Sequence, residues 1–160
     1  MKPETANRSR PAAVAGSWYP GDRAALGSVL ATQLARVEEP QTGEIVGLIV
    51  PHAGLVYSGP VAAHAYRAVA DRQFDVVVLV GPSHYEVFDG VAIYPSGAFE
   101  TPLGSVVVAS DVADRLMKSP VIGTHPRAHV REHSLEMQLP FLQRVLSDTP
   151  IVPLLIGRQV

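Results

Sequence analysis

The segment IVGLIVPHAGLVYSGPVAAHAYRAVADRQFDVVVLVG, residues 45–81, decides the fold that the sequence predicts. Its two ends, 45–50 and 74–81, are short apolar runs without alternation, which is typical of parallel strands covered on both faces. Between them, residues 58–72 follow a helical pattern, with Ser58 placed to cap the helix and Pro60 in its first turn. The segment therefore predicts a strand–helix–strand unit.

Helices and strands alternate along the rest of the chain. The remaining predicted elements are helices at 22–38, 110–119 and 132–148 and strands at 90–95, 105–110 and 150–157. Asp22 is a predicted N-cap, as is Ser110 or Asp111, and Pro140 predicts either a kink or a helix start near residue 139. The interleaving predicts an α/β fold, a three-layer α/β/α sandwich around a mostly parallel or mixed sheet.

Length and composition limit the classes of protein that the chain can belong to. The chain has 160 residues, of which 47% are apolar and 18% charged, which is enough for one domain with a buried core. We expect this domain at 11–160 and a disordered tail at the polar residues 1–10. A net charge of −2 argues against a nucleic-acid partner, and no apolar run is long enough to span a membrane. The absence of cysteine suits a cytoplasmic location.

The region around the last predicted strand is unusual for an open α/β domain. Only three residues follow the strand PLLIG, where a loop and a covering helix are common. We therefore expect the chain to be part of a longer protein. We also expect the strand at 151–156 to be an exposed edge that promotes dimerisation or aggregation.

Two histidines follow two of the predicted strands closely. His52 comes directly after 45–50, and His84 lies three residues beyond 74–81. Ligands of open α/β sheets bind beyond the carboxyl ends of the strands, so both imidazoles are expected at one edge of the sheet. Each could be an ordinary loop histidine, but together they predict half of a metal site, since imidazole suits Fe, Cu, Zn and Ni.

The stretch EHSLE, residues 132–136, offers further chemistry. Glu132, His133 and Glu136 combine two carboxylates with a titratable imidazole. A carboxylate often orients a metal-bound histidine, and His133 could move protons. The alternative is a surface loop with scattered histidines, since His125 and His129 lie nearby.

Several aromatic and hydroxyl side chains flank these positions in the sequence. Trp18 lies before the first helix and could line a pocket or fill the core at the N-terminus. The residues predicted to contact a substrate are Trp18, Tyr57, Ser58, Ser83 and Tyr85.

Five segments, in order, resemble the Memo family, also called the AmmeMemoRadiSam system protein B group. They are AGSWYPGD, PHAGLVYSGPVAAHAY, GPSHY, FETPLG and EHSLEMQLPFL. The resemblance implies a fold similar to that of class III extradiol dioxygenases, which are non-haem iron enzymes. It also implies that His52 and His84 are metal ligands and that Glu132, His133 and Glu136 line the same pocket.

The sequence departs from the family pattern beyond its last predicted strand. Family members are longer and carry an SSDxxHY-like segment and a late CG segment, which add an Asp, a His and a Cys to the pocket. Neither segment occurs in these 160 residues. The resemblance therefore implies a metal site of which this chain supplies only a part.

Three functions are compatible with these features. The first is metal-dependent, dioxygenase-like oxidation of a small aromatic substrate, with Fe(II) as the expected metal and Cu or Zn as alternatives. The second is a non-catalytic module that recognises a peptide or small anion in the same cleft, and the third is a metal-dependent hydrolase. A homo-oligomer is a further expectation, whereas nucleic acid and membrane are not expected partners.

Overall fold

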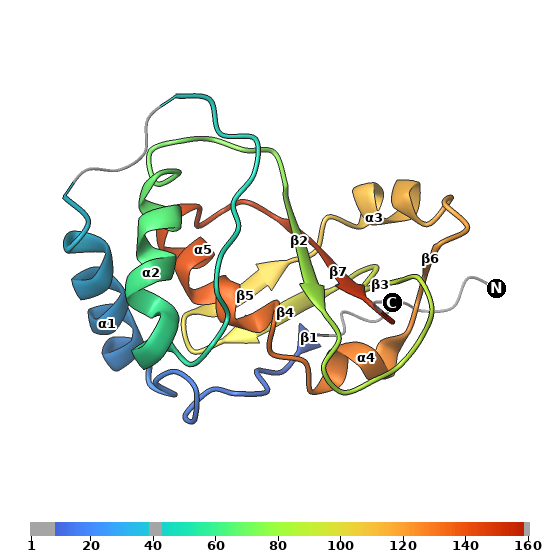
Figure 1. Cartoon of the computed structure of the whole chain (residues 1–160), viewed down its shortest axis with the longest axis horizontal. Helices are drawn as coiled ribbons and strands as arrows, with labels where there is room; N and C mark the ends of the chain where they lie inside the picture. The colour runs from blue at the N-terminus through green and yellow to red at the C-terminus, as the bar shows by residue number, and fades with distance from the viewer. Residues whose placement is uncertain (1–8, 39–42, 159–160) are drawn as a thin grey trace.

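The computed structural model describes residues 9–38 and 43–158, which form two β-sheets and their covering helices (Figure 1). The larger sheet has four strands in the order β2-β7-β3-β6, and the smaller one has three in the order β1-β4-β5. The strands are β1 (Ser9–Arg10), β2 (Val77–Pro82), β3 (Val91–Ile93), β4 (Ala98–Thr101), β5 (Gly104–Val107), β6 (Ile122–Gly123) and β7 (Ile151–Ile156). The helices are α1 (Arg23–Ala35), α2 (Leu55–Arg67), α3 (Ser110–Leu116), α4 (Pro126–Val130), the 3₁₀ helix η1 (Glu136–Gln138) and α5 (Leu139–Val145).

Both sheets contain parallel and antiparallel pairs. In the larger sheet β2 is parallel to β7, whereas β3 is antiparallel to β7 and parallel to β6. In the smaller sheet β4 is parallel to β1 and antiparallel to β5. The predicted α/β class with a mixed sheet is therefore confirmed, and the second sheet is an addition that the sequence patterns did not predict.

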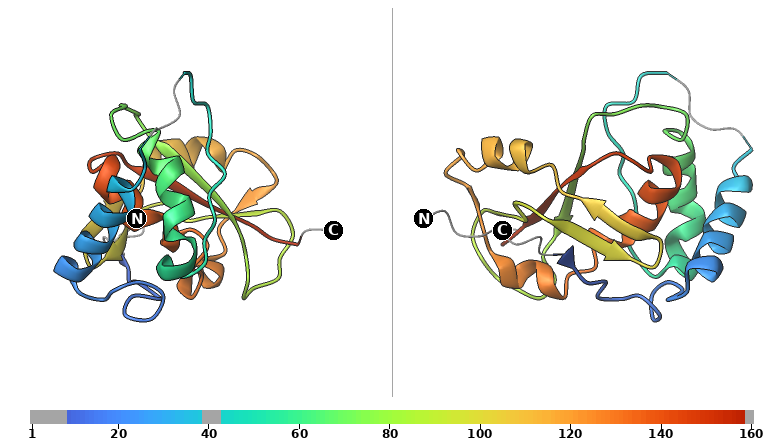
Figure 2. Two further views of the ribbon diagram at one scale, coloured as in Figure 1. Left: turned by 60° about the vertical axis from the view of Figure 1, so that its left-hand side comes forward. Right: turned by 180° about the vertical axis from the view of Figure 1, so that it is seen from behind.

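The central strand β7 is covered on both faces, as its apolar sequence requires. Val152 and Leu154 pack in a cluster with Ala113 of α3. Ile151 and Leu155 point to the opposite face, where α1, α2 and α5 contribute to the main core. Figure 2 shows these three helices gathered on one side of the strands. This arrangement is the α/β/α sandwich that the sequence predicts.

Local signals at two helix starts are confirmed. The Asp22 carboxylate accepts a hydrogen bond from the backbone N–H of Ala25, 2.9 Å away, and α1 begins at the next residue. Helix α5 begins at Leu139 with Pro140 in its first turn, where the missing N–H costs nothing. The 3₁₀ helix η1 precedes it, so the predicted helix 132–148 is divided near residue 139.

Two other predicted caps are wrong. Helix α2 begins at Leu55 with Gly54 as its N-cap, so Ser58 and Pro60 lie inside the helix. Helix α3 has Ala109 as its N-cap and no side-chain cap. Helix α2 begins before Ser58 because its first turn buries the apolar side chain of Leu55. Tertiary packing of this kind can outweigh the preference for a capping side chain.

The largest correction concerns residues 45–50, which were predicted to be a strand. They run beside β2 but carry no strand pairing, and Val46 and Ile49 are fully exposed (Figure 1). The predicted strand–helix–strand unit is therefore wrong at its first strand. Apolar composition favours an extended segment, but a strand also needs a hydrogen-bonded neighbour at the right distance.

The expected edge strand and disordered tail also need correction. Strand β7 lies between β2 and β3, so the expectation of an exposed edge at 151–156 is wrong. Ser9–Arg10 forms β1 against β4, although residues 1–10 were expected to be disordered; residues 1–8 lie outside the described residues. Strand β4 lies between the predicted strands at 90–95 and 105–110, where no strand was predicted.

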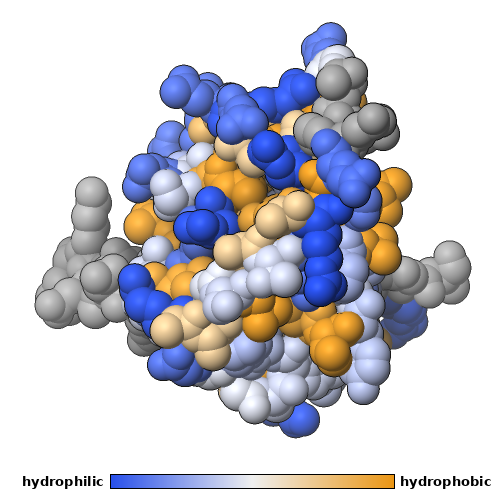
Figure 3. All heavy atoms as spheres, turned by 90° about the vertical axis from the view of Figure 1, so that its left-hand side faces the viewer, coloured by the Kyte–Doolittle hydropathy of each residue, from blue (hydrophilic) through white to orange (hydrophobic). Residues whose placement is uncertain are grey.

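Within residues 9–38 and 43–158, no helix is long and apolar enough to cross a membrane. The longest helices, α1 and α2, have 13 residues each. Apolar side chains nevertheless reach the surface of α2, at Val56 and Val61. Figure 3 views the α1–α2 side and shows apolar side chains interspersed with hydrophilic ones.

Candidate metal centre

Three histidines from separate segments meet at the carboxyl ends of 45–50 and β2. His52 follows 45–50, His84 lies two residues beyond β2, and His133 lies between α4 and η1. One ring nitrogen from each lies within 4.8 Å of the other two. The ring centroids of His84 and His133 are 4.5 Å apart, and His52 lies 5.3 Å from His84. The convergence predicted for His52 and His84 is thus present, and His133 joins it.

Glu132 holds His84 in one orientation. Its Oε1 lies 2.8 Å from Nδ1 of His84, and its Oε2 accepts the backbone N–H of His84 at 2.6 Å. The same carboxylate accepts the backbone N–H groups of His133 and Ser134. Donation from Nδ1 leaves Nε2 of His84 with a free lone pair, which is the form that binds a metal.

The charges of these groups at neutral pH also suit a metal. Burial by itself would raise the pKa of Glu132, but hydrogen bonds from His84 and Ser134 outweigh it and the pKa is lowered. Burial lowers the pKa of His52 and of His133, and the positive charge that His84 can carry lowers both further. The net pKa of His52 and of His133 is lowered even though the charge of Glu132 acts in the opposite direction, so these two imidazoles favour the neutral, metal-binding form beside an ionised carboxylate.

The donor set fits a divalent transition metal. Three imidazoles are a common ligand set for Zn, Cu and Fe. Nδ1 of His133 is buried and has no hydrogen-bond partner among the described residues. The atom lies 3.6 Å from Oε1 of Glu132, too far for a hydrogen bond, and a bound ion that it ligates would relieve the cost of leaving it unbonded. The chain therefore contains a group that could hold a metal ion.

A glycine permits the close approach of β2 to the segment that carries Glu132 and His133. A Cβ atom at Gly81 would lie 2.8 Å from Oγ of Ser134 and 2.9 Å from a methyl group of Leu135. Ser134 also donates from Oγ to the carbonyl of Pro82. Together, these contacts fix His84 and His133 relative to each other.

Glu136, predicted to be catalytic, is fully buried and binds the N-terminal segment. It forms an ion pair with Arg10 at 2.7 Å and accepts hydrogen bonds from the backbone N–H groups of Ala13 and Val14 and from Tyr19. Its carboxylate therefore anchors residues 10–19, the segment that carries Trp18. A catalytic role for Glu136 stays a prediction.

Two of the predicted substrate-contacting residues lie beside the histidine cluster. The ring centroid of Trp18 lies 4.2 Å from that of His133. The ring centroid of Tyr85 lies 5.9 Å from that of His133, in an edge-to-face arrangement. The guanidinium of Arg131 lies over the Tyr85 ring at 4.8 Å. Aromatic side chains thus form two of the boundaries of the cluster.

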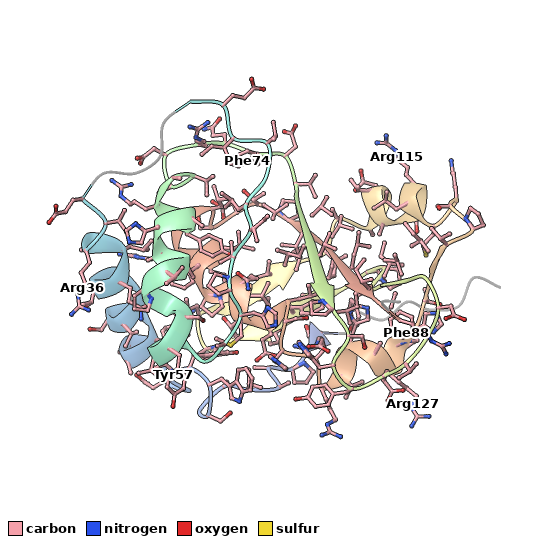
Figure 4. All side chains as sticks on the ribbon, in the orientation of Figure 1. Arg36, Tyr57, Phe74, Phe88, Arg115 and Arg127 are labelled. Atoms are coloured by element: carbon pink, nitrogen blue, oxygen red, sulfur yellow. The ribbon has the colours of Figure 1, made fainter. Side chains whose placement is uncertain are left out.

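The other three predicted substrate-contacting residues are Tyr57, Ser58 and Ser83. Tyr57 is exposed near the start of α2 (Figure 4). The hydroxyl of Ser58 donates to the carbonyl of Ala53, and that of Ser83 donates to the carbonyl of Glu86. Their contact with a substrate stays a prediction.

Of the three histidines spaced four apart, only His133 reaches the cluster. His125 stacks on Phe88 with ring centroids 4.6 Å apart. His129 is buried between Tyr94 and Phe99, and its Nε2 has no partner among the described residues. Pro126 starts the short helix α4 after His125, which breaks the helical repeat on which a shared face would depend.

We expect His129 to make the folded chain sensitive to acid. Burial, and then the charge of Arg10, lower its pKa from 6.5 to about 4. Between these values the unfolded chain binds a proton that the folded chain does not, so stability falls as the pH falls. The expected loss is about 3 kcal/mol between pH 6.5 and 4.

Urea unfolding of the parent and of His129→Phe at several pH values measures this loss. The variant should lose less stability than the parent across this pH range. Equal pH dependence in the two proteins would show that His129 does not contribute.

Sequence reasoning missed the role of Arg10. Its guanidinium is buried, pairs with Glu136 and donates to the backbone carbonyl of His129. A single arginine in a polar N-terminal stretch carries no local signal of burial, because its partner lies more than a hundred residues away in the sequence. A two-residue strand such as β1 is equally invisible to periodicity.

Comparisons with known proteins match the chain over most of its length. The sequence model of the Memo-like protein family matches residues 10–160. A relative from Pyrobaculum arsenaticum, described as a MEMO1 family protein, is 38% identical over 161 residues, which cover 95% of this chain and 57% of that protein. A MEMO1 family protein from Saccharolobus solfataricus is 49% identical over 114 residues, covering 69% of this chain and 40% of that protein.

The chain thus spans less than two thirds of the length of the curated relatives that it matches. The family match nevertheless includes His52, His84, Glu132 and His133. On the extent of this match and the identities of the relatives, the chain belongs to the Memo-like protein family.

Proposed function

We propose that His52, His84 and His133 bind one divalent metal ion and that the site supports metal-dependent oxidation of a small aromatic substrate. The observation that carries the proposal is the convergence of three imidazole nitrogens within 4.8 Å. Fe(II) is the metal proposed, with Cu or Zn as alternatives. A cytoplasmic location, in keeping with the lack of cysteine, is part of the same proposal.

The residues of this chain have distinct roles in the proposed site. The three histidines hold the ion, and Glu132 keeps Nδ1 of His84 protonated so that Nε2 remains a ligand. A bound Fe(II) would supply redox chemistry and Lewis acidity. Trp18 and Tyr85 offer aromatic surfaces next to the ligands, against which a planar substrate could pack.

His133 has a different role here from the one that the sequence suggested. One of its ring nitrogens lies within 4.8 Å of those of His52 and His84, which supports including it in the proposed ligand set, whereas the sequence predicted a proton-transfer role. A ligand must be deprotonated, so one imidazole nitrogen cannot bind the metal and carry a proton at the same time.

Anaerobic titration of the purified chain with Fe(II), and separately with Co(II) as a spectroscopic probe, tests metal binding. We expect one ion per chain and a change in the fluorescence of Trp18, which is the single tryptophan. Oxygen consumption with simple catechols then tests the reaction. If one ion binds per chain but no oxygen is consumed, the proposed metal site stands and the proposed oxidation of an aromatic substrate is contradicted.

The exposed aromatic surface of Trp18 and Tyr85 favours a second candidate, a module that binds a peptide or small anion without turnover. Arg131, stacked on Tyr85, would add a positive charge for an anionic group. Peptide binding that survives His52→Ala would support this candidate, and binding lost with the metal would contradict it.

A further inference from the structure

One edge of the larger sheet is open beside an apolar cavity. Strand β2 pairs with β7 on one side, and none of the strands that the structure describes pairs with its other side. Residues 45–50 run along that open side, and a cavity of about 370 Å³ is lined by both segments. We call the space between 45–50 and β2 the open slot.

The backbone of β2 presents free hydrogen-bonding groups to the open slot. The N–H groups of Val77 and Ser83 donate to the β7 side, to the carbonyls of Pro150 and Ile156. Groups alternate along a strand, so the N–H and C=O groups of Val78 and Val80 point the other way, into the slot. Such an edge is a template for pairing with another strand.

The side chains along the slot are apolar and uncovered. Val78 and Val80 pair in register with Val152 and Leu154 and lie on the face that α3 covers at β7. At β2 that cover is missing, and Val80 is 60% exposed. Across the slot, Val46 and Leu48 line the same cavity, and their exposed fractions are 95% and 38%. Exposed apolar side chains gathered around one cavity often mark an interaction site.

The two segments that border the open slot, 45–50 and β2, limit what could fill it. A sheet edge of a second copy could approach β2 from outside, but it would leave the apolar side chains of 45–50 uncovered. A second copy would have to release one of its own strands to fill the slot, and each strand that the structure describes is paired within its own sheet. None of the described strands is free to enter the slot, which favours a single extended segment supplied by another polypeptide.

We propose that the open slot accepts one apolar β-strand, supplied by polypeptide equivalent to the part of the relatives that this chain does not span. The curated relatives are long enough to provide it, because the matched region is 57% of the Pyrobaculum arsenaticum relative. The strand pairs with the N–H and C=O groups of Val78 and Val80, which pair with no described strand, and covers Val46 and Leu48. This addition of a strand to a sheet edge needs no metal.

Co-expression tests the proposal. The partner probe is the part of the Pyrobaculum arsenaticum relative that lies outside its match to this chain, produced as a separate tagged polypeptide. We expect a one-to-one complex and at least tenfold slower hydrogen exchange at the N–H groups of Val78 and Val80. The N–H groups of Leu79 and Gly81, which point to β7, are the internal control and should change much less.

Two matched substitutions separate the slot from general surface effects. Val80→Lys should abolish the complex, whereas Val107→Lys on β5 should leave it intact, since both valines are 60% exposed on edge strands. Absence of a complex, or equal effects of the two substitutions, would overturn the proposal. Concentration-dependent protection of Val78 and Val80 in the chain alone would also overturn it, because a second copy would then fill the slot.

Discussion

Glu136→Gln should destabilise the folded chain by about 3–5 kcal/mol, the range found when one partner of a buried ion pair is removed. The substitution leaves the guanidinium of Arg10 charged and buried without its counter-ion. It also weakens the hydrogen bonds from Ala13, Val14 and Tyr19 that anchor the N-terminal segment. Urea unfolding at pH 7 measures the change in the free energy of unfolding.

A surface ion pair provides the control for this prediction. Arg67 and Asp71 lie one helical turn apart at 3.2 Å and are both exposed. Asp71→Asn should cost no more than about 1 kcal/mol, because solvent screens the pair. Similar losses for Glu136→Gln and Asp71→Asn would show that the buried pair contributes little.

Trp18 fluorescence gives a second measurement of the same substitution. Residues 10–19 hold Trp18 against His133, and Glu136 is their anchor. Loosening this segment should alter the emission of Trp18 under conditions where the rest of the chain remains folded. An unchanged emission spectrum would mean that Trp18 is positioned by other contacts, such as its carbonyl, which accepts the N–H of Leu55.

Glu132→Gln should weaken metal binding by about 10–100-fold, which is the usual effect of removing a carboxylate that orients a histidine ligand. An amide can present its N–H₂ group to Nδ1 of His84, which would favour the tautomer whose Nε2 carries a proton. His52→Ala should weaken binding by more than this, because it removes a ligand. Competition titration with Zn(II) or Co(II) measures both affinities.

The matched control replaces a carboxylate that lies away from the cluster. Glu100 accepts hydrogen bonds from Ser105 in the smaller sheet, so Glu100→Gln should leave the metal affinity unchanged. Unfolding of each metal-free variant shows whether the fold survives. If Glu132→Gln folds and binds metal as tightly as the parent, Glu132 does not orient His84.

The sequence predicted the residues of the candidate metal centre better than their roles. His52 and His84 follow extended apolar segments, and chain connectivity alone places them near the ends of those segments. Glu132 and His133 were recognised as one functional stretch, but their approach to His84 depends on contacts between Ser134, Gly81 and Pro82. Such contacts join segments about 50 residues apart and leave no periodic pattern.

The sequence by itself determined the α/β class, the cap of α1, the helix start at Leu139 and the burial of β7, because each depends on neighbouring residues or on local hydrophobicity. Only the tertiary structure decided that 45–50 remains unpaired, that β7 is central and that Arg10 meets Glu136. These features depend on which distant segments become neighbours. Apolar patterns report whether a segment tends to be buried, but they do not name its partner.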